Sequence, residues 1–147
     1  MFRLTVTLEL PPQNVRPNSR PHWRAKAKAV QDYRAKALAA AQEALGGKYP
    51  PYLEAALVHI KFYNKTARKM DGDNIIASMK SAIDGLTDAG IFDDDREVMY
   101  LPPLREKDKD NPRIELLIFE CDDEDPVVKS LNNMLKTLGD EEFHGRL

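Results

Sequence analysis

The stretch Asp71-Gly72-Asp73-Asn74 places two carboxylates two residues apart, at the start of a helical pattern. Two acids held on a turn can converge on one cation, and Mg²⁺ prefers such oxygen ligands. The same spacing is also expected of an ordinary helix start, where an aspartate accepts hydrogen bonds from free amides. We expect Asp73 to be the N-cap of a helix from about Asn74 to Ala89, with Gly90 as its C′ glycine.

A third source of carboxylates follows about twenty residues later, at Asp93, Asp94 and Asp95. A chain that returns from the predicted helix could bring these acids beside the first two. Three acids from two loops form a plausible site for one or two cations, which activate water and stabilise the leaving oxygen in phosphodiester hydrolysis. The alternative is an acidic turn on the surface.

Lys80 lies on the same predicted helix. At ~100° per residue it falls within about 40° of Asp73 and Asp84 around the helix axis. A lysine at that position could reach a phosphate oxygen near a bound metal. The alternative, which the residues alone favour slightly, is an exposed ion pair between Lys80 and Asp84, worth a few tenths of a kcal/mol.

The elements that must position these residues follow from hydrophobic periodicity. Alternation predicts strands over residues 2–10, 53–63, 98–101 and 114–119, and helical spacing predicts helices over 26–45 and 74–89. The charged residues 105–111 are expected to form a turn. The order β-α-β-α-β-β predicts an α+β fold, with a small mixed sheet of about four strands and two helices packed on it.

Charge is distributed unevenly along the chain. The net charge of −2 divides into +9 over residues 1–70 and −11 over residues 71–147. The basic half could face a polyanion, and the acidic half could hold divalent cations. The alternative is an unevenly charged, solvated surface. The side chains that could follow DNA phosphates are Arg16, Arg20, Arg24, Lys26, Lys28, Lys65, Arg68 and Lys69.

The 147 residues are enough for one domain with its own core. No apolar run approaches the ~20 residues of a membrane helix, and no signal-peptide core is present, so we expect a cytoplasmic protein. The single cysteine excludes an internal disulfide. We place the domain at residues 1–121. Residues 122–147 are predicted to form an acidic linker and a C-terminal amphipathic helix, which docks on its own subunit, on a dimer mate or on another protein.

Trp23 follows a basic, proline-containing segment. We expect its ring to pack on the helix that follows. The other possibility is that the ring stacks on a base of opened DNA. The three histidines share no ligand spacing and none is expected to act as a catalytic base.

The motif residues together resemble the RusA-type Holliday-junction resolvases. The resemblance rests on Arg68 to Asn74, Lys80 with Asp84-Gly85-Leu86, and Asp88 to Asp95, and it extends to Pro11-Pro12, Asn14 and Arg16. It spans roughly residues 1–121, and residues 68–98 are its specific part. About three residues are inserted between Asp73 and Lys80 relative to the shortest members of the family, and the tail has no counterpart there.

The resemblance implies a function and a site. Asp71, Asp73 and Asp95 correspond to the catalytic, metal-binding aspartates, with Asp94 replacing Asp95 if the register differs by one. Lys80 corresponds to the catalytic lysine. Such enzymes are homodimers that use Mg²⁺ to resolve four-way DNA junctions by paired cuts, and they occur in bacteria and phages.

Two other functions remain open from the sequence. A nuclease that acts on flaps or forks would carry the same residues. A non-catalytic protein that binds branched DNA would keep the fold and the charge asymmetry. The intact set of acids argues against the second, because acids that face phosphates without a metal gain nothing for binding.

Overall fold

The computed structural model describes residues 2–67, 70–94, 98–121 and Lys129. Arg68, Lys69 and Asp95 lie outside the described residues, as does the predicted tail apart from Lys129. Within the described ranges, no helix is both long and apolar enough to span a membrane.

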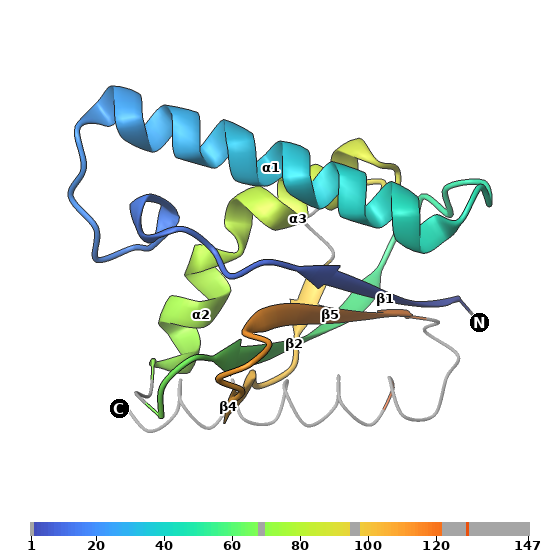
Figure 1. The fold of residues 1–147 in the computed structure, drawn as a ribbon. Helices are drawn as coiled ribbons and strands as arrows, with labels where there is room; N and C mark the ends of the chain where they lie inside the picture. Colours follow the sequence, from blue (N-terminus) through green and yellow to red (C-terminus); the bar gives the residue numbers. More distant parts are fainter. Residues whose placement is uncertain (1, 68–69, 95–97, 122–128, 130–147) are drawn as a thin grey trace, which may run out of the picture.

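The protein is an α+β fold in which helices cover one face of a mixed sheet (Figure 1), as predicted. Chain order is β1 (Arg3–Leu8), a 3₁₀ turn η1 (Gln13–Val15), α1 (Trp23–Leu45), β2 (Ala56–Asn64), α2 (Gly72–Ser78), α3 (Lys80–Asp88), β3 (Val98–Tyr100), β4 (Leu104–Lys107) and β5 (Arg113–Glu120).

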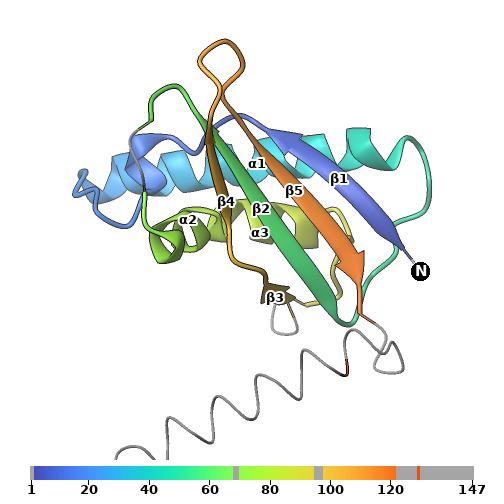
Figure 2. The same cartoon turned by 90° about the horizontal axis from the view of Figure 1, so that it is seen from below.

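The sheet has the order β1-β5-β2-β3, with β4 also paired to β2. β5 runs antiparallel to both of its neighbours, whereas β3 and β4 run parallel to β2. Figure 2 shows β3 and β4 following one another along the same edge of β2. β3 pairs with the first residues of β2, from Ala56, and β4 pairs with its last residues, up to Asn64.

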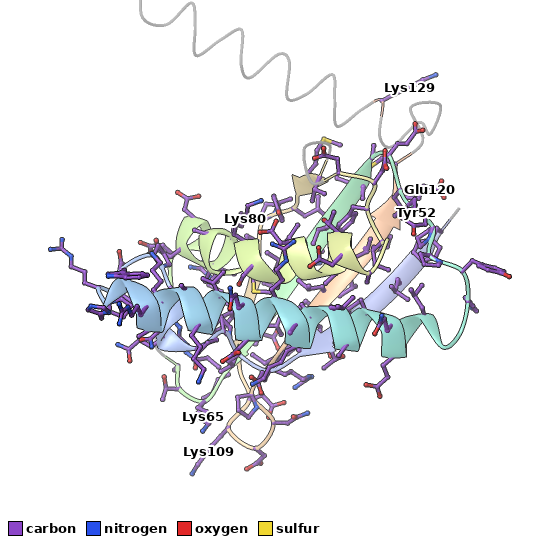
Figure 3. All side chains as sticks on the ribbon, turned by 90° about the horizontal axis from the view of Figure 1, so that it is seen from above. Tyr52, Lys65, Lys80, Lys109, Glu120 and Lys129 are labelled. Atoms are coloured by element: carbon purple, nitrogen blue, oxygen red, sulfur yellow. The ribbon has the colours of Figure 1, made fainter. Side chains whose placement is uncertain are left out.

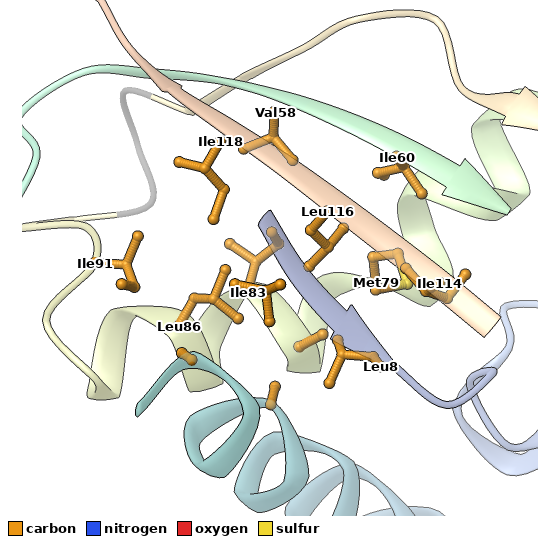
Figure 4. Close-up of a cluster of buried hydrophobic side chains, with 14 of the residues drawn as sticks. Leu8, Val58, Ile60, Met79, Ile83, Leu86, Ile91, Ile114, Leu116 and Ile118 are labelled. Atoms are coloured by element: carbon orange, nitrogen blue, oxygen red, sulfur yellow. The ribbon is translucent and has the colours of Figure 1, made fainter. Parts of the chain in front are cut away.

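The core lies between the sheet and the helices (Figure 4). Alternate residues of a strand point to the same face, so the period of two in β2 and β5 buries one set of side chains. These side chains pack against buried apolar side chains of α3 and of Met79, which precedes it. The buried residues are Val58, Ile60, Phe62, Ile114, Leu116, Ile118, Met79, Ile83 and Leu86.

β4 corrects the turn expected from residue 105. All four residues of β4 are exposed, so the segment carries no hydrophobic alternation from which a strand could be predicted. It is a strand because its backbone pairs with Lys61–Asn64 of β2. The sheet therefore has five strands where about four were expected.

The prediction of one continuous helix from Asn74 to Ala89 is wrong. The chain forms two helices, α2 and α3, which are separated at Met79. Met79 has φ −95° and ψ −1°, and its amide bonds to the carbonyls of Ile76 and Ala77. Its side chain is fully buried, with the Tyr33 hydroxyl 3.9 Å from the sulfur. The calculation that placed Asp73 and Lys80 on one stripe assumed a continuous helix, so it does not hold across this break.

α1 begins at Trp23, three residues before the predicted start, and it packs closely on α3. A Cβ added at Gly85 would lie 2.3 Å from the carbonyl oxygen of Arg34, so the helices approach closely there. The Arg34 guanidinium donates two hydrogen bonds to Asp88, at 2.6 and 2.7 Å, and lowers the pKa of that carboxyl. Because this pair is exposed it adds little stability. The close packing of the helices is what positions α3.

Candidate active site

Asp71 and Asp73 flank the first residue of α2, and both are exposed. Asp71 occupies the N-cap position with an extended backbone, so the prediction that Asp73 is the N-cap is wrong. Asp73 lies instead in the first helical turn. The Asp71 side chain makes no capping hydrogen bond, so its carboxylate does not bind the free amides of α2. A negative charge near a helix N-terminus is stabilised by the helix dipole.

A cavity of ≈ 370 Å³ opens beside Asp71. Three segments far apart in the sequence form its wall: the loop after β1, the end of β2 and the start of α2. Figures 1 and 2 show η1 and α2 at the same end of the molecule. The cavity is lined by Gln13, Arg16, Pro17, Asn18, Ser19, Asn64, Met70, Asp71 and Asn74.

Hydrogen bonds hold the two loops of this cavity in place. The Arg16 guanidinium donates to the carbonyl of Pro11 from Nε and Nη2, at 3.3 and 3.2 Å, and Val15 beside it is buried. Arg105 Nη1 donates to the carbonyl of Met70, another residue of the lining, at 2.8 Å. The residue before Asp71 is therefore tied to β4, a strand that the sequence did not predict.

A second, smaller cavity of ≈ 150 Å³ shares Asn64 and Met70 with the first, and Arg105 and Lys107 line it. Asn64 pairs with Lys107, and its carbonyl accepts a hydrogen bond from the amide of Asp108 at 2.8 Å. In Figure 3, Lys65 and Lys109 project at the same end of the molecule.

β4 thus adds basic residues next to the candidate site that the sequence did not assign. Arg105 and Lys107 line the smaller cavity, and Lys109 follows in the turn after β4. They belong to residues 71–147, whose net negative charge gave no indication of a basic surface. The charged run 105–111 was their only signal in the sequence.

The predicted DNA-binding residues that the structure describes lie on the loop after β1, the start of α1 and the segment after β2. Arg16 is partly buried and lines the larger cavity. The exposed ones are Arg20, Arg24, Lys26, Lys28 and Lys65. Arg68 and Lys69 lie outside the described residues.

Of the third acidic segment, the structure describes Asp93 and Asp94, and the amide of Asp93 donates to the carbonyl of Leu53 at 2.9 Å, shortly before β2 begins. β3 begins opposite Ala56, at the start of β2, whereas a Cβ on Gly72 would lie 3.6 Å from Pro103, further along that edge. In the part of the chain that the structure describes, no three acidic, histidine or cysteine side chains come close enough to hold a metal ion. Asp71 and Asp73 both lie at the start of α2, the cavity lining includes Asp71 but not Asp73, and Asp95 lies outside the described residues.

Lys80 forms the ion pair that was its alternative role. Its ammonium lies 3.0 Å from Oδ1 of Asp84, and its side chain is 64% exposed on the first turn of α3 (Figure 3). The break at Met79 separates this turn from Asp73.

The donor atoms around Asp71 suit a hard divalent cation. The cavity offers a carboxylate and the amide oxygens of Gln13, Asn64 and Asn74, with no thiol or imidazole in its lining. Mg²⁺ is usually held by one or two carboxylates together with substrate phosphates and water. The cavity supplies the Asp71 carboxylate, and Asp73, which is not in its lining, lies two residues further along the chain.

In this α+β fold, Asp71 at the start of α2 and Arg16 in the loop after β1 line one cavity. Residues 12–118 match the family model described as "Endodeoxyribonuclease RusA", and the chain belongs to this family. A relative from Xylella fastidiosa (strain Temecula1 / ATCC 700964), named only "Uncharacterized protein", is 35% identical over 97 residues. That match covers 65% of this chain and 63% of the relative. The resemblance seen in the motif residues is confirmed.

Proposed function

We propose that this protein is a Mg²⁺-dependent endonuclease that resolves four-way DNA junctions by paired phosphodiester cuts. The observation that carries the proposal is the ≈ 370 Å³ cavity between Asp71 and the loop that bears Arg16. The lining supplies oxygen ligands for a cation and the Arg16 guanidinium for a phosphate. Membership of an endodeoxyribonuclease family supports DNA as the substrate.

In this proposal Asp71 and Asp73 hold Mg²⁺, with Asp95 as a further ligand. Bound Mg²⁺ supplies an activated water and stabilises the leaving oxygen in phosphodiester hydrolysis. The residues of the chain orient the substrate. Arg16 binds a phosphate at the cavity, and Asn64 and Asn74 offer amide groups to the sugar-phosphate backbone.

The basic residues extend the contact on both sides of the cut. The start of α1 follows one stretch of backbone, and β4 with the turn after it follows another. Phosphate contacts of this kind position DNA without reading its sequence, and they make affinity depend on salt. Lys80 has to leave Asp84 to reach a phosphate, and because that pair is exposed its cost is a few tenths of a kcal/mol.

The test is cleavage of a panel of labelled DNAs of equal length: a four-way junction, a fork, a flap and a linear duplex. We expect paired, symmetric cuts in the junction with Mg²⁺ and none with EDTA. Preferred cutting of the fork or flap would assign the same site to a different branched substrate. Tight binding of the junction without cleavage of any DNA in the panel would show that the protein is a non-catalytic DNA-binding protein.

The third ligand is tested by comparing two neighbouring aspartates. Asp95→Asn should lower the single-turnover cleavage rate in Mg²⁺ by at least about 10-fold, because changes around a metal site typically cost 10–100-fold. Asp94→Asn is the matched control, since it removes the same charge one residue away. A loss confined to Asp94→Asn would move the ligand by one residue, and no loss in either variant would remove this segment from the site.

Paired cuts require two active sites related by a two-fold axis, so we expect a homodimer. Light scattering on the purified protein at micromolar concentration should give twice the 16.7 kDa mass of one chain. A single-chain mass, both alone and on junction DNA, would contradict paired cutting by one assembly.

A further inference from the structure

Trp23 is a large aromatic side chain left in solvent at the start of α1. Its side chain and backbone are together 68% exposed, although the sequence led us to expect a ring packed on the helix. That expectation is wrong, and the reason is position: the first turn of α1 extends past the body of the fold, and residues 22–28 are all exposed. An aromatic ring that is this exposed adds little to the stability of the fold, and an exposed apolar side chain can mark a binding site.

Neighbouring side chains hold the Trp23 ring. His22 is the N-cap of α1, and its Nδ1 accepts a hydrogen bond from the amide of Arg24 at 3.3 Å. The two rings stack with centroids 5.7 Å apart and planes 29° apart. The Arg24 guanidinium lies 5.1 Å from the Trp23 centroid. The indole is thus stacked on the His22 ring and contacted by a long, exposed cation.

The surroundings of Trp23 are positively charged and close to the candidate site. Arg20, Arg24, Lys26 and Lys28 are exposed around it. Ser19, only four residues before Trp23, lines the cavity that contains Asp71. A chain spans at most about 14 Å over four residues, so the backbone of Trp23 lies within that distance of Ser19. Figure 1 shows the start of α1 at the same end of the molecule as η1 and α2.

We propose that Trp23 stacks on an unpaired or unstacked base next to the branch point of the bound DNA. This inference rests on the proposed function, because a branch point is where bases become available to a ring. Every base has an aromatic face, so the contact reads structure and not sequence. A base that takes the place of the Arg24 guanidinium on the ring frees that cation for the adjacent phosphate.

The single tryptophan of the chain makes the inference directly measurable. In EDTA, so that nothing is cut, full-length protein is titrated with a four-way junction, with oligothymidylate and with a blunt duplex. We expect the emission of Trp23 to be quenched by the first two, whose bases are accessible, and much less by the duplex at equal saturation. Saturation is measured independently by anisotropy of labelled DNA.

Variants give the energetic side of the test. Trp23→Ala should raise the Kd for the junction by about 5- to 140-fold, the usual range for loss of one base–aromatic stack. Trp23→Phe should keep most of the affinity. Tyr49→Ala is the matched control, because Tyr49 is 95% exposed and lies beyond the other end of α1. It should bind like the wild type, and all three variants should melt within a few degrees of it.

The results separate this inference from the proposed function. Wild-type affinity of Trp23→Ala for the junction, with unquenched emission in the wild type, would overturn the stacking role while leaving binding and cleavage intact. Equal quenching by the duplex would mean that Trp23 contacts DNA without stacking on an accessible base, which also overturns it. Failure of the wild type to bind or cut any branched DNA would contradict the proposed function itself.

Discussion

Asp73→Asn should abolish cutting of junction DNA in Mg²⁺ while the protein still binds the junction. The change removes a carboxylate from the pair at the start of α2 and keeps its size. We expect the single-turnover rate to fall by at least about 100-fold, since loss of a ligand should cost at least as much as loss of its supporting residues. Binding measured in EDTA should be unchanged or tighter, because one negative charge that faces phosphate is gone.

Asp32→Asn is the control for this variant. Asp32 is an exposed aspartate on α1, so its substitution makes the same change of charge away from the cavity. It should cut like the wild type. Asp73 also lies in the first turn of α2, where a carboxylate contributes about 0.3–1 kcal/mol through the helix dipole, so Asp73→Asn should melt only slightly earlier. Cleavage at the wild-type rate would show that the site is assigned to the wrong residues.

Gly90→Ala should be strongly destabilising. Gly90 follows α3 with φ +79°, a conformation that side chains rarely adopt, and an added Cβ would lie 2.7 Å from Cβ of Pro50 and 2.9 Å from the Tyr52 ring. Left-handed backbone costs about 1–2 kcal/mol and overpacking about 1–3 kcal/mol, so we expect a loss of about 2–5 kcal/mol. For a chain of this size the melting temperature should fall by roughly 5–15 °C. Thermal and urea unfolding measure this loss.

Gly46→Ala separates the two contributions. Gly46 ends α1 with φ +58°, and nothing lies within 4 Å of a Cβ added there. Only the backbone cost of about 1–2 kcal/mol should then appear. If both variants lose the same stability, the contact of Gly90 with Pro50 and Tyr52 contributes nothing.

The strands that form the core could be predicted because apolar and polar residues alternate along them as their side chains alternate between the core and the solvent. β2 and β5 bury every second residue, β1 buries Val6 and Leu8 with Leu4 partly buried, and all three were expected within a few residues of their bounds. Gly90 was expected at the end of a helix and has the positive φ that this position requires. The family was also recognisable, because its motif is a local run of residues around Asp71 and Asp73.

Other features could not be predicted because they depend on contacts between distant segments. The helix break at Met79 accompanies burial of that side chain under Tyr33, which is 46 residues away. β4 exists because β2 offers it a free edge, and its exposed residues leave no pattern. Trp23 is exposed because α1 extends beyond the sheet, and no local sequence signal records where a neighbouring element ends.

The sequence by itself determined the class of fold, the acidic pair and the family, since each is written in residue types at short spacing. Only the tertiary structure decided what faces the pair. It brought Arg16 and Asn64 to a cavity with Asp71 and tied the residue before Asp71 to Arg105 of β4. The physical reason is the pairing of strands in the sheet, because a strand can pair with a free edge far away in the sequence. Which residues share a site therefore depends on pairing and packing across the fold and not on their order in the chain.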